Sequence, residues 1–298
     1  MSKNLLTRIA VAAVAIPIIL TICYTGGYWY FGMIALFAIA AATEFLLNEG
    51  YRLRQPVFWL FLLFILMCLD ISAVSFGQGD LGDFARPFEG AHSLMHHLAA
   101  LMVGFFLFSA MVAAVGKSAP DELFRKQSRL FFGVFYVGCL YSFVLAIGME
   151  PKLENVFGPS AHGNFLLFLF GLLWVGDTCA MGFGKWLGKH KLAPAVSPNK
   201  TVEGFIGGII GAVAVGVLMY FWKFSHLGFI HTMASAVGCS IFGQLGDLVE
   251  SLWKRSLGIK DSSTIIPGHG GVLDRFDSLL FAAPFMYAYL IVFVPPNL

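Results

Sequence analysis

Long apolar runs separated by short polar segments repeat along the whole chain. A helix needs about 20 mostly apolar residues to cross a bilayer. By that measure the sequence predicts about nine membrane-spanning helices, at residues 5–24, 28–47, 56–76, 98–115, 130–148, 164–184, 204–222, 227–247 and 279–295. We therefore expect an all-α fold, a polytopic membrane helical bundle.

The first apolar run follows Lys3 and Arg8, as the apolar part of a signal peptide would. It is long enough to cross the membrane and further spans follow it, so we predict a retained first helix. With the N-terminus in the cytoplasm, every Lys and Arg falls in a cytoplasmic segment except Arg86, Lys152 and Lys223. Because cytoplasmic loops carry the excess of basic residues, this orientation is favoured, and it leaves the C-terminus outside.

The composition agrees with a membrane protein. Only 12% of the residues are charged and 58% are hydrophobic, whereas a soluble domain carries about twice that share of charge. A net charge of +2 without a basic stripe gives no reason to expect nucleic acid as a partner. The five cysteines lie singly in or beside apolar runs, so we expect buried hydrophobic residues and not metal ligands.

Polar chemistry is concentrated in the second half of the chain. We divide it into residues 1–128, the N-terminal transmembrane helices, and residues 129–298, a catalytic transmembrane region with cytoplasmic loops 185–203 and 248–278. The outer loop 77–97 carries acidic and histidine residues, but nothing there completes a metal-ligand set, and its role is left open.

The end of the eighth predicted span is unusually polar. Asp247, Glu250, Ser251 and Lys254 follow each other at positions i, i+3, i+4 and i+7, so a helix presents all four on one face. A salt-bridged helix end would explain the pattern equally well. Ionisable groups at the end of a membrane helix that leads into a glycine-rich loop favour a functional site.

The loop that follows combines glycine with charge. Glycines flank His269 and would let backbone N–H groups approach an oxyanion. Asp274 and Asp277 then face the same way at a helix start. Carboxylates beside a phosphate-binding backbone are typical of Mg²⁺ sites, where water and substrate phosphate complete the coordination.

A second polar segment follows Asp177. Ser197 and Pro198 resemble a helix N-cap with proline at the first helical position. That arrangement would direct helix-terminal amides, Lys200 and Thr201 to the cytoplasmic mouth, where they suit a triphosphate. Alternatively, the lysines of this segment only set the topology or contact anionic lipid.

The stretch from Ser251 to Asp277 resembles the signature of the phosphatidate cytidylyltransferases, the CDP-diacylglycerol synthases. The matching positions are Ser251, Lys254, Arg255, Lys260, Asp261, Ser263, Ile266, Pro267, His269, Gly270, Gly271, Asp274, Arg275 and Asp277. Upstream, the family pattern is matched by Asp177, Thr178, Ala180, Ser197, Pro198, Lys200, Thr201, Glu203 and Gly204. Trp253 and Met181 depart from the residues usual in the family. The resemblance covers residues 130–298, and the first four spans only in general character.

The resemblance implies that CTP and phosphatidate react to give CDP-diacylglycerol and pyrophosphate. Catalytic roles fall to Asp247, Lys254, Arg255, Asp274, Arg275 and Asp277. Substrate contacts fall to Asp177, Lys200, Thr201, Glu203, Ser251, Lys260, His269, Gly270 and Gly271. Asp247 and Asp274 are assigned as the main Mg²⁺ ligands, with Asp277 and Glu250 as further ligands or neighbours, and a second cation fits a two-metal pattern. Expected partners are membrane lipids and a second copy in a homodimer, in a bacterial inner membrane with the site facing the cytoplasm.

Other functions stay open at this stage. A related enzyme could activate another lipid phosphate, such as a polyprenyl or ether-lipid phosphate, because specificity would lie in the acyl-facing walls. A transporter predicts broken helices in both halves, whereas breaks occur only in the second half of this sequence. The motif of CDP-alcohol phosphotransferases is absent, and a catalytically inactive scaffold is disfavoured because the signature keeps all its charged residues.

Overall fold

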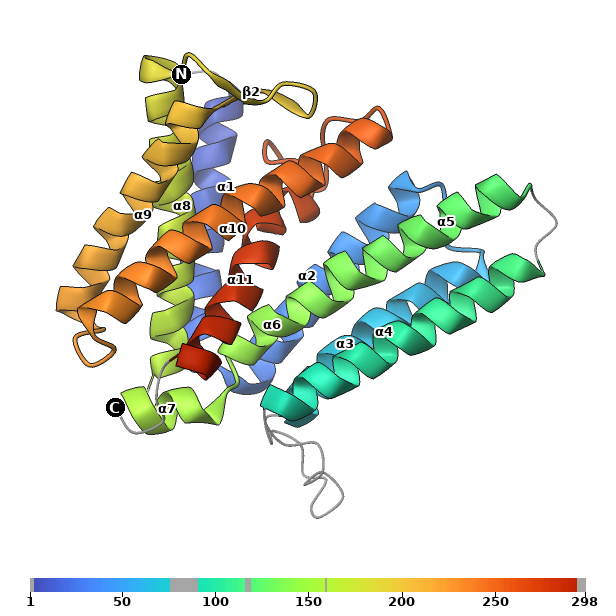
Figure 1. Cartoon of the computed structure of the whole chain (residues 1–298), viewed down its shortest axis with the longest axis horizontal. Coiled ribbons are helices and arrows are strands. Elements are labelled where there is room, and N and C mark those ends of the chain that lie inside the picture. Colours follow the sequence, from blue (N-terminus) through green and yellow to red (C-terminus); the bar gives the residue numbers. More distant parts are fainter. Residues whose placement is uncertain (1–2, 76–90, 116–118, 159, 294–298) are drawn as a thin grey trace. The chain divides into compact units, whose positions relative to one another are not determined.

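The computed structural model describes residues 3–75, 91–115, 119–158 and 160–293. These residues are almost entirely helical, with one small two-stranded sheet (Figure 1). The chain divides into two compact units. Unit 1 comprises Met1–Gly26 with Glu150–Leu298, and unit 2 comprises Gly27–Met149.

Unit 2 is a helical bundle. Its elements are α2 (Gly27–Asn48), α3 (Pro56–Ser75), α4 (Ala91–Ala114), α5 (Pro120–Gly133), the π-helical segment η3 (Val134–Cys139) and α6 (Leu140–Ile147). The last three form one continuous helical stretch. In α6, the hydroxyl of Ser142 is shared between the carbonyl oxygens of Cys68 on α3 (3.0 Å) and Gly138 in the π-helical segment (2.9 Å). The contact with Cys68 joins the stretch to α3.

Unit 1 holds all the predicted site residues. Its elements are α1 (Lys3–Thr25), α7 (Pro151–Phe157), α8 (Ala161–Leu187), β1 (Lys191–Ala193), β2 (Ser197–Thr201), α9 (Val202–Trp222), α10 (Phe229–Ser256) and α11 (Leu273–Phe293). Glycines let α8 and α9 approach closely: a Cβ at Gly211 would lie 2.7 Å from the sulfur of Cys179. Such small-residue contacts are how membrane helices pack without a hydrophobic driving force.

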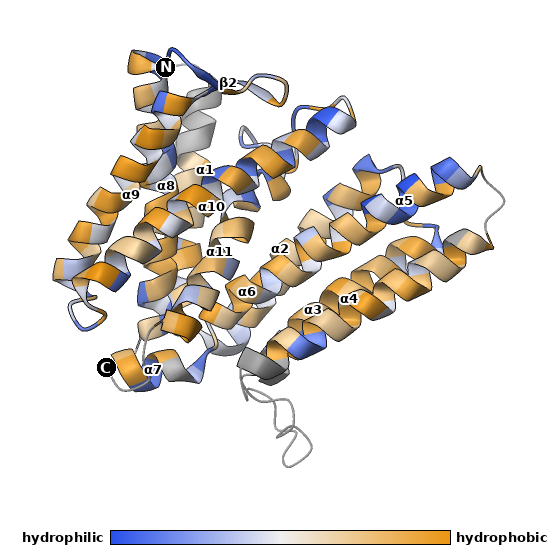
Figure 2. Ribbon diagram, viewed as in Figure 1, coloured by the Kyte–Doolittle hydropathy of each residue, from blue (hydrophilic) through white to orange (hydrophobic). Residues whose placement is uncertain are grey.

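Apolar residues run along most of each helix, while polar residues gather at helix ends and on the β1–β2 hairpin (Figure 2). Within the described ranges, seven helical segments are long and apolar enough to cross a membrane: Gly27–Asn48, Pro56–Ala73, Leu94–Val112, Pro120–Ile147, Ala161–Leu187, Val202–Trp222 and Leu273–Phe293. The chain is therefore an all-α, polytopic membrane protein.

The other predicted spans, 5–24 and 227–247, also fall on helices, α1 and α10. In α1, the apolar stretch whose side chains the structure describes is Ala10–Thr25, and α10 ends in the charged sequence around Lys254. Nine crossings and the placement of the two termini therefore stay predictions. Most of the outer loop 77–97 lies outside the described residues, which resume at Ala91.

One local prediction was wrong. We expected a helix to begin at Ser197 and Pro198, but these residues open strand β2, which pairs antiparallel with β1. Helix α9 begins only after Thr201, whose backbone is extended and whose hydroxyl accepts a hydrogen bond from the N–H of Gly204 at 3.1 Å. Thr201 supplies the cap that we had assigned to Ser197, and Pro198 is tolerated because a two-stranded hairpin has only edge strands.

The contact between α10 and α11 gives a stability prediction. A Cβ on Gly246 would lie 2.6 Å from the carbonyl oxygen of Asp277, so Gly246→Ala must push the two helices apart. We expect a loss of roughly 1–3 kcal/mol of stability, the usual cost of overpacking, measured as a lower melting temperature in detergent. The control is Gly182→Ala, because no atom lies within 4 Å of the Cβ position there. Equal melting temperatures for both variants would contradict the close helix contact.

Candidate functional site

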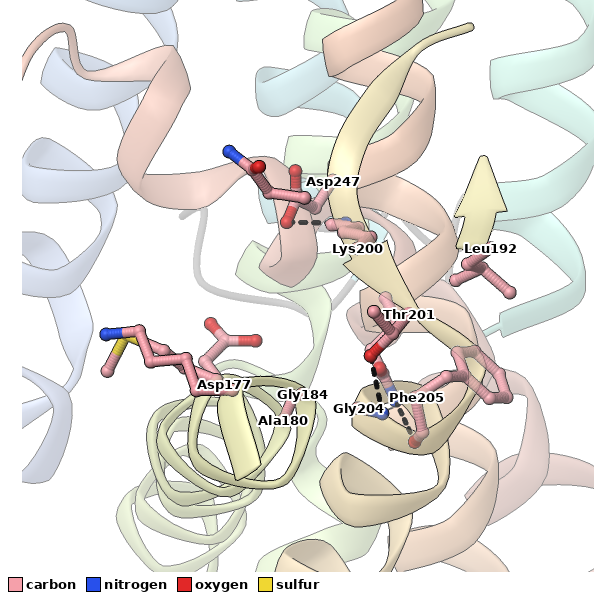
Figure 3. Close-up of a pocket in the computed structure, with 13 residues that line it drawn as sticks. Asp177, Ala180, Gly184, Leu192, Lys200, Thr201, Gly204, Phe205 and Asp247 are labelled. Atoms are coloured by element: carbon pink, nitrogen blue, oxygen red, sulfur yellow. Dashed lines mark hydrogen bonds and ion pairs between the residues drawn. The ribbon is translucent and has the colours of Figure 1, made fainter. Parts of the chain in front are cut away.

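A cavity of about 590 Å³ opens in unit 1 between α8, the β1–β2 hairpin, the start of α9 and the end of α10 (Figure 3). It gathers residues from both segments that the sequence singled out. Asp177 comes from α8, Lys200 and Thr201 come from β2, and Asp247 comes from α10. Segments up to 70 residues apart in the chain thus share one polar cavity.

The hairpin is fixed at its base by Glu203. The carboxylate of Glu203 lies 2.7 Å from Nδ1 of His190 and accepts from the backbone N–H of His190 at 3.2 Å. The N–H of Val202 donates to the carbonyl oxygen of His190 at 2.9 Å. Glu203, predicted as a substrate contact, therefore holds together the two ends of the hairpin in this structure, next to the cavity-lining residue Thr201.

Lys200 reaches from the hairpin to α10. Its ammonium lies 2.7 Å from Oδ2 of Asp247 (Figure 3). The other oxygen of Asp247 accepts a hydrogen bond from the hydroxyl of Ser251 at 3.3 Å. That contact confirms the predicted shared helical face one turn apart. Asp177, on the α8 wall, is close enough to Asp247 and Lys200 for their charges to interact.

A second cluster surrounds Lys254. Its ammonium donates to Glu250 on the same helix at 2.6 Å and to Asp274 at the start of α11 at 2.7 Å. All three residues are buried. Burial acts against the charge on Lys254, but the two carboxylates outweigh it and raise the pKa of this ammonium above its ordinary value. Lys254 is therefore charged across the physiological pH range. Its ion pair with Asp274 joins the start of α11 to α10.

Asp274 also folds the loop between the two helices. Its Oδ2 accepts from the backbone N–H of Ser262 (2.8 Å), the hydroxyl of Ser262 (3.0 Å) and the N–H of Gly271 (2.8 Å). Gly270 has a φ of +83°, and a Cβ on it would lie 2.8 Å from Oδ2 of Asp274. Glycine is thus required there both by the backbone conformation and by the approach of the carboxylate.

The remaining predicted residues lie around these two clusters. Arg255 donates to the carbonyl oxygens of Val196 on the hairpin (3.3 Å) and Ile259 (2.8 Å). His269 lies in the tight turn of the loop, where its backbone N–H donates to the carbonyl oxygen of Ile266. Lys260 and Arg275 are exposed. Asp277 accepts from the N–H of Ser278 and is within electrostatic range of Asp247.

The acidic residues fit one kind of metal site only. Within the described ranges, no three His, Cys, Asp or Glu side chains converge so as to hold a metal ion by themselves. Asp247 nevertheless faces the cavity with an oxygen that already binds a cation, the ammonium of Lys200. Glu250 carries a buried oxygen, Oε1, that has no hydrogen-bond partner among the described residues, but Glu250 does not line the cavity. The lining carboxylates, Asp177 and Asp247, suit Mg²⁺ that takes one or two protein carboxylates and completes its shell with water and phosphate.

Sequence reasoning missed part of the cavity wall. Gln244 lines it one helical turn before Asp247, and its amide donates to the carbonyl oxygen of Phe205 at 3.2 Å. Gln244 precedes Asp247 by three residues on α10, and this helical spacing could have placed it on the same face in the sequence analysis. Phe205 and Asn199 also line the cavity, but an isolated aromatic residue in an apolar helix and an exposed amide carry no signal in the sequence.

Comparison with known proteins agrees with the site. The model of the cytidylyltransferase family matches residues 6–293. The chain belongs to this family. A phosphatidate cytidylyltransferase of Staphylococcus haemolyticus is 35% identical over 286 residues, which cover 95% of this chain and 98% of that protein. One of Staphylococcus aureus is 48% identical over 158 residues, 53% of this chain and 56% of that protein. The family match makes this membrane protein a nucleotidyltransferase.

The loop contacts of Asp274 give a prediction that does not depend on turnover. In Asp274→Asn the side chain loses its charge, and an NH2 group replaces one of the two oxygens. Either the bond from Lys254 or the bonds from Ser262 and Gly271 are therefore lost, and the rest go to a neutral acceptor. We expect the amides of Ser262 and Gly271 to exchange hydrogen roughly tenfold faster or more, since hydrogen bonds to charged groups are the stronger ones. Hydrogen–deuterium exchange with mass spectrometry measures this.

The matched control is Asp261→Asn, an exposed aspartate of the same loop, which should leave that exchange unchanged. Unaltered protection in Asp274→Asn would show that this carboxylate does not organise the loop.

Proposed function

We propose that the chain transfers the cytidylyl group of CTP to phosphatidate, giving CDP-diacylglycerol and pyrophosphate. The observation that carries the proposal is the cavity that joins Lys200 and Thr201 of the nucleotide-side motif to Asp247, just before the signature. Membership of the cytidylyltransferase family and the names of the relatives support the same reaction. The proposal includes a bacterial cell membrane, a site that faces the cytoplasm, and assembly as a homodimer.

In this reaction an oxygen of the phosphatidate phosphate attacks the α-phosphorus of CTP. The bond from the α-phosphorus to the bridging oxygen breaks, and pyrophosphate leaves with the electron pair. The nucleophile is already an anion, so no strong base is needed. The protein's task is to bring two polyanions together in line and to neutralise their charge.

The cavity suits the nucleotide. Lys200 and Lys185 both line it and can meet phosphate charge. The cap of α9 lies at its wall, so that helix begins beside the proposed triphosphate, as anion sites at helix N-termini do. Gln244 and Asn199 add neutral polar groups for the rest of the nucleotide.

The lipid phosphate is assigned to the rim near the exposed guanidinium of Arg275, whose charge is within range of Asp177. Arg255 and Lys260 are further exposed cations near the same loop. Lys254 has a different role in this proposal: because it is buried between Glu250 and Asp274, it holds the loop in place and acts on the substrates only through that loop.

Mg²⁺ belongs to the proposal as the cofactor, with Asp247 as its principal protein ligand and Asp177, Asp277 and Glu250 as neighbouring acids. When bound, it would neutralise charge on the phosphates and polarise the α-phosphorus. Asp274, which the sequence assigned as a second principal ligand, has both oxygens occupied by Lys254 and by the loop. We therefore assign it to positioning. A second cation remains part of the proposal.

The function is tested with detergent-purified protein. We expect pyrophosphate release from CTP only when both phosphatidate and Mg²⁺ are present. Parallel reactions with a polyprenyl phosphate and an ether-lipid phosphate decide between phosphatidate and the other lipid phosphates. If no pyrophosphate is released with phosphatidate or with any other lipid phosphate, the proposal is refuted. Faster turnover with a polyprenyl phosphate than with phosphatidate would identify a polyprenyl phosphate as the preferred substrate.

Asp247→Asn tests the role of the cavity carboxylate. The change keeps the size of the side chain but removes the charge that faces the proposed phosphates and cation. We expect kcat to fall by roughly 100-fold or more, as when an electrostatic contact of a transition state is removed, with an unchanged melting temperature. Asp121→Asn, on the exposed start of α5, is the control and should keep wild-type turnover. Near-normal kcat in Asp247→Asn would exclude this carboxylate from the reaction.

A further inference from the structure

Lys200 and Asp247 form an ion pair on the wall of the cavity (Figure 3). The proposed function assigns these residues to different ligands, Lys200 to the triphosphate and Asp247 to the divalent cation. In this structure they neutralise each other across 2.7 Å. Binding of either ligand therefore competes with this ion pair.

This pair is much less enclosed than the pairs of Lys254. The side chains of Lys200 and Asp247 are 25% and 35% exposed, whereas the side chain of Lys254 is 11% exposed and binds two carboxylates that are 0% and 4% exposed. Partly solvated ion pairs contribute little free energy, but breaking a buried one leaves uncompensated charge. Lys200 is therefore the displaceable lysine of the site and Lys254 is the fixed one.

Lys200 can also leave without unfolding its surroundings. The hairpin stays attached at its base through His190 and Glu203 and at its tip through the bond from Arg255 to the carbonyl oxygen of Val196. A flexible lysine stem lets the ammonium swing while the strand stays in place.

We propose that Lys200 occupies the cation position beside Asp247 until CTP binds, so that the empty enzyme binds divalent cations poorly. The ammonium and a divalent cation compete for the same oxygen, Oδ2 of Asp247. A triphosphate in the cavity offers Lys200 a more highly charged partner and brings its own cation to the vacated carboxylate. Metal and nucleotide binding are then coupled through one side chain. This inference rests on the proposed function for the identity of the nucleotide.

The test measures Mn²⁺ binding to the full chain in detergent, without CTP or lipid substrate, from the electron paramagnetic resonance signal of free Mn²⁺. In Lys200→Met the competing ammonium is gone, and we expect Mn²⁺ affinity to rise by roughly fivefold, the scale of a partly exposed ion pair. In the double variant with Asp247→Asn the gain should disappear, because the released oxygen is removed as well.

Lys185→Met is the matched control. Lys185 lines the same cavity, and no ion pair to Asp247 is found for it in the part of the chain that the structure describes. Its removal changes the charge of the cavity by the same amount, and we expect less than a twofold gain. Equal gains in Mn²⁺ affinity in the two lysine variants would mean that the gain reflects only the changed net charge of the cavity, which would overturn the proposal. An unchanged Mn²⁺ affinity in Lys200→Met would also overturn it.

Lys200→Gln is measured in parallel with thermal melting, so that a folding defect of one variant does not decide the result. Because the readout needs no turnover, it is independent of the pyrophosphate assay. An enzyme inactive with every lipid phosphate but with the expected Mn²⁺ pattern would refute the proposed function and leave the competition intact. Normal turnover without the expected Mn²⁺ pattern would support the proposed function and refute the competition between Lys200 and the divalent cation.

Discussion

The arrangement of the site depends on the buried ammonium of Lys254. It binds Glu250 one turn earlier on α10 and Asp274 at the start of α11. A buried charge is costly unless it is paired and hydrogen-bonded, so these helix ends and the loop between them must be arranged together. Asp274 transmits this constraint to the backbone at Ser262 and Gly271. The ammonium of Lys254 thereby holds in place the loop that carries most of the family signature.

The same requirement shapes how the chain meets the membrane. A helix that has to carry Asp247, Glu250, Lys254 and Arg255 in its last turns cannot also be apolar throughout, which is why α10 lacks the apolar character of α9 or α11. Polar chemistry is concentrated at the helix ends and in the hairpin. Glycines on α9 allow the close packing that holds the cavity walls together beneath them.

Much of this could be predicted from the sequence because it depends on local periodicity. Where the structure describes it, each predicted span falls on helical structure, and the i, i+4 spacing correctly paired Asp247 with Ser251. The β1–β2 hairpin was missed because Ser197 and Pro198 also fit a helix start, and only the pairing with β1 decides between the two. The hydrogen bonds from the loop to Asp274 could not be predicted either, because they depend on how a glycine-rich loop folds back on itself.

Burial is also what distinguishes the two lysines, and the sequence could not rank them. Lys200 and Lys254 both lie in family motifs and both pair with aspartate at 2.7 Å. One pair sits on a cavity wall and the other between two helices, so the contact of Lys200 is more exposed to solvent and costs less to break than the contact of Lys254. In our proposal an enzyme that joins two polyanions uses both kinds of charge: the enclosed charge of Lys254 keeps the loop folded, and the more exposed charge of Lys200 releases a carboxylate when the substrate arrives.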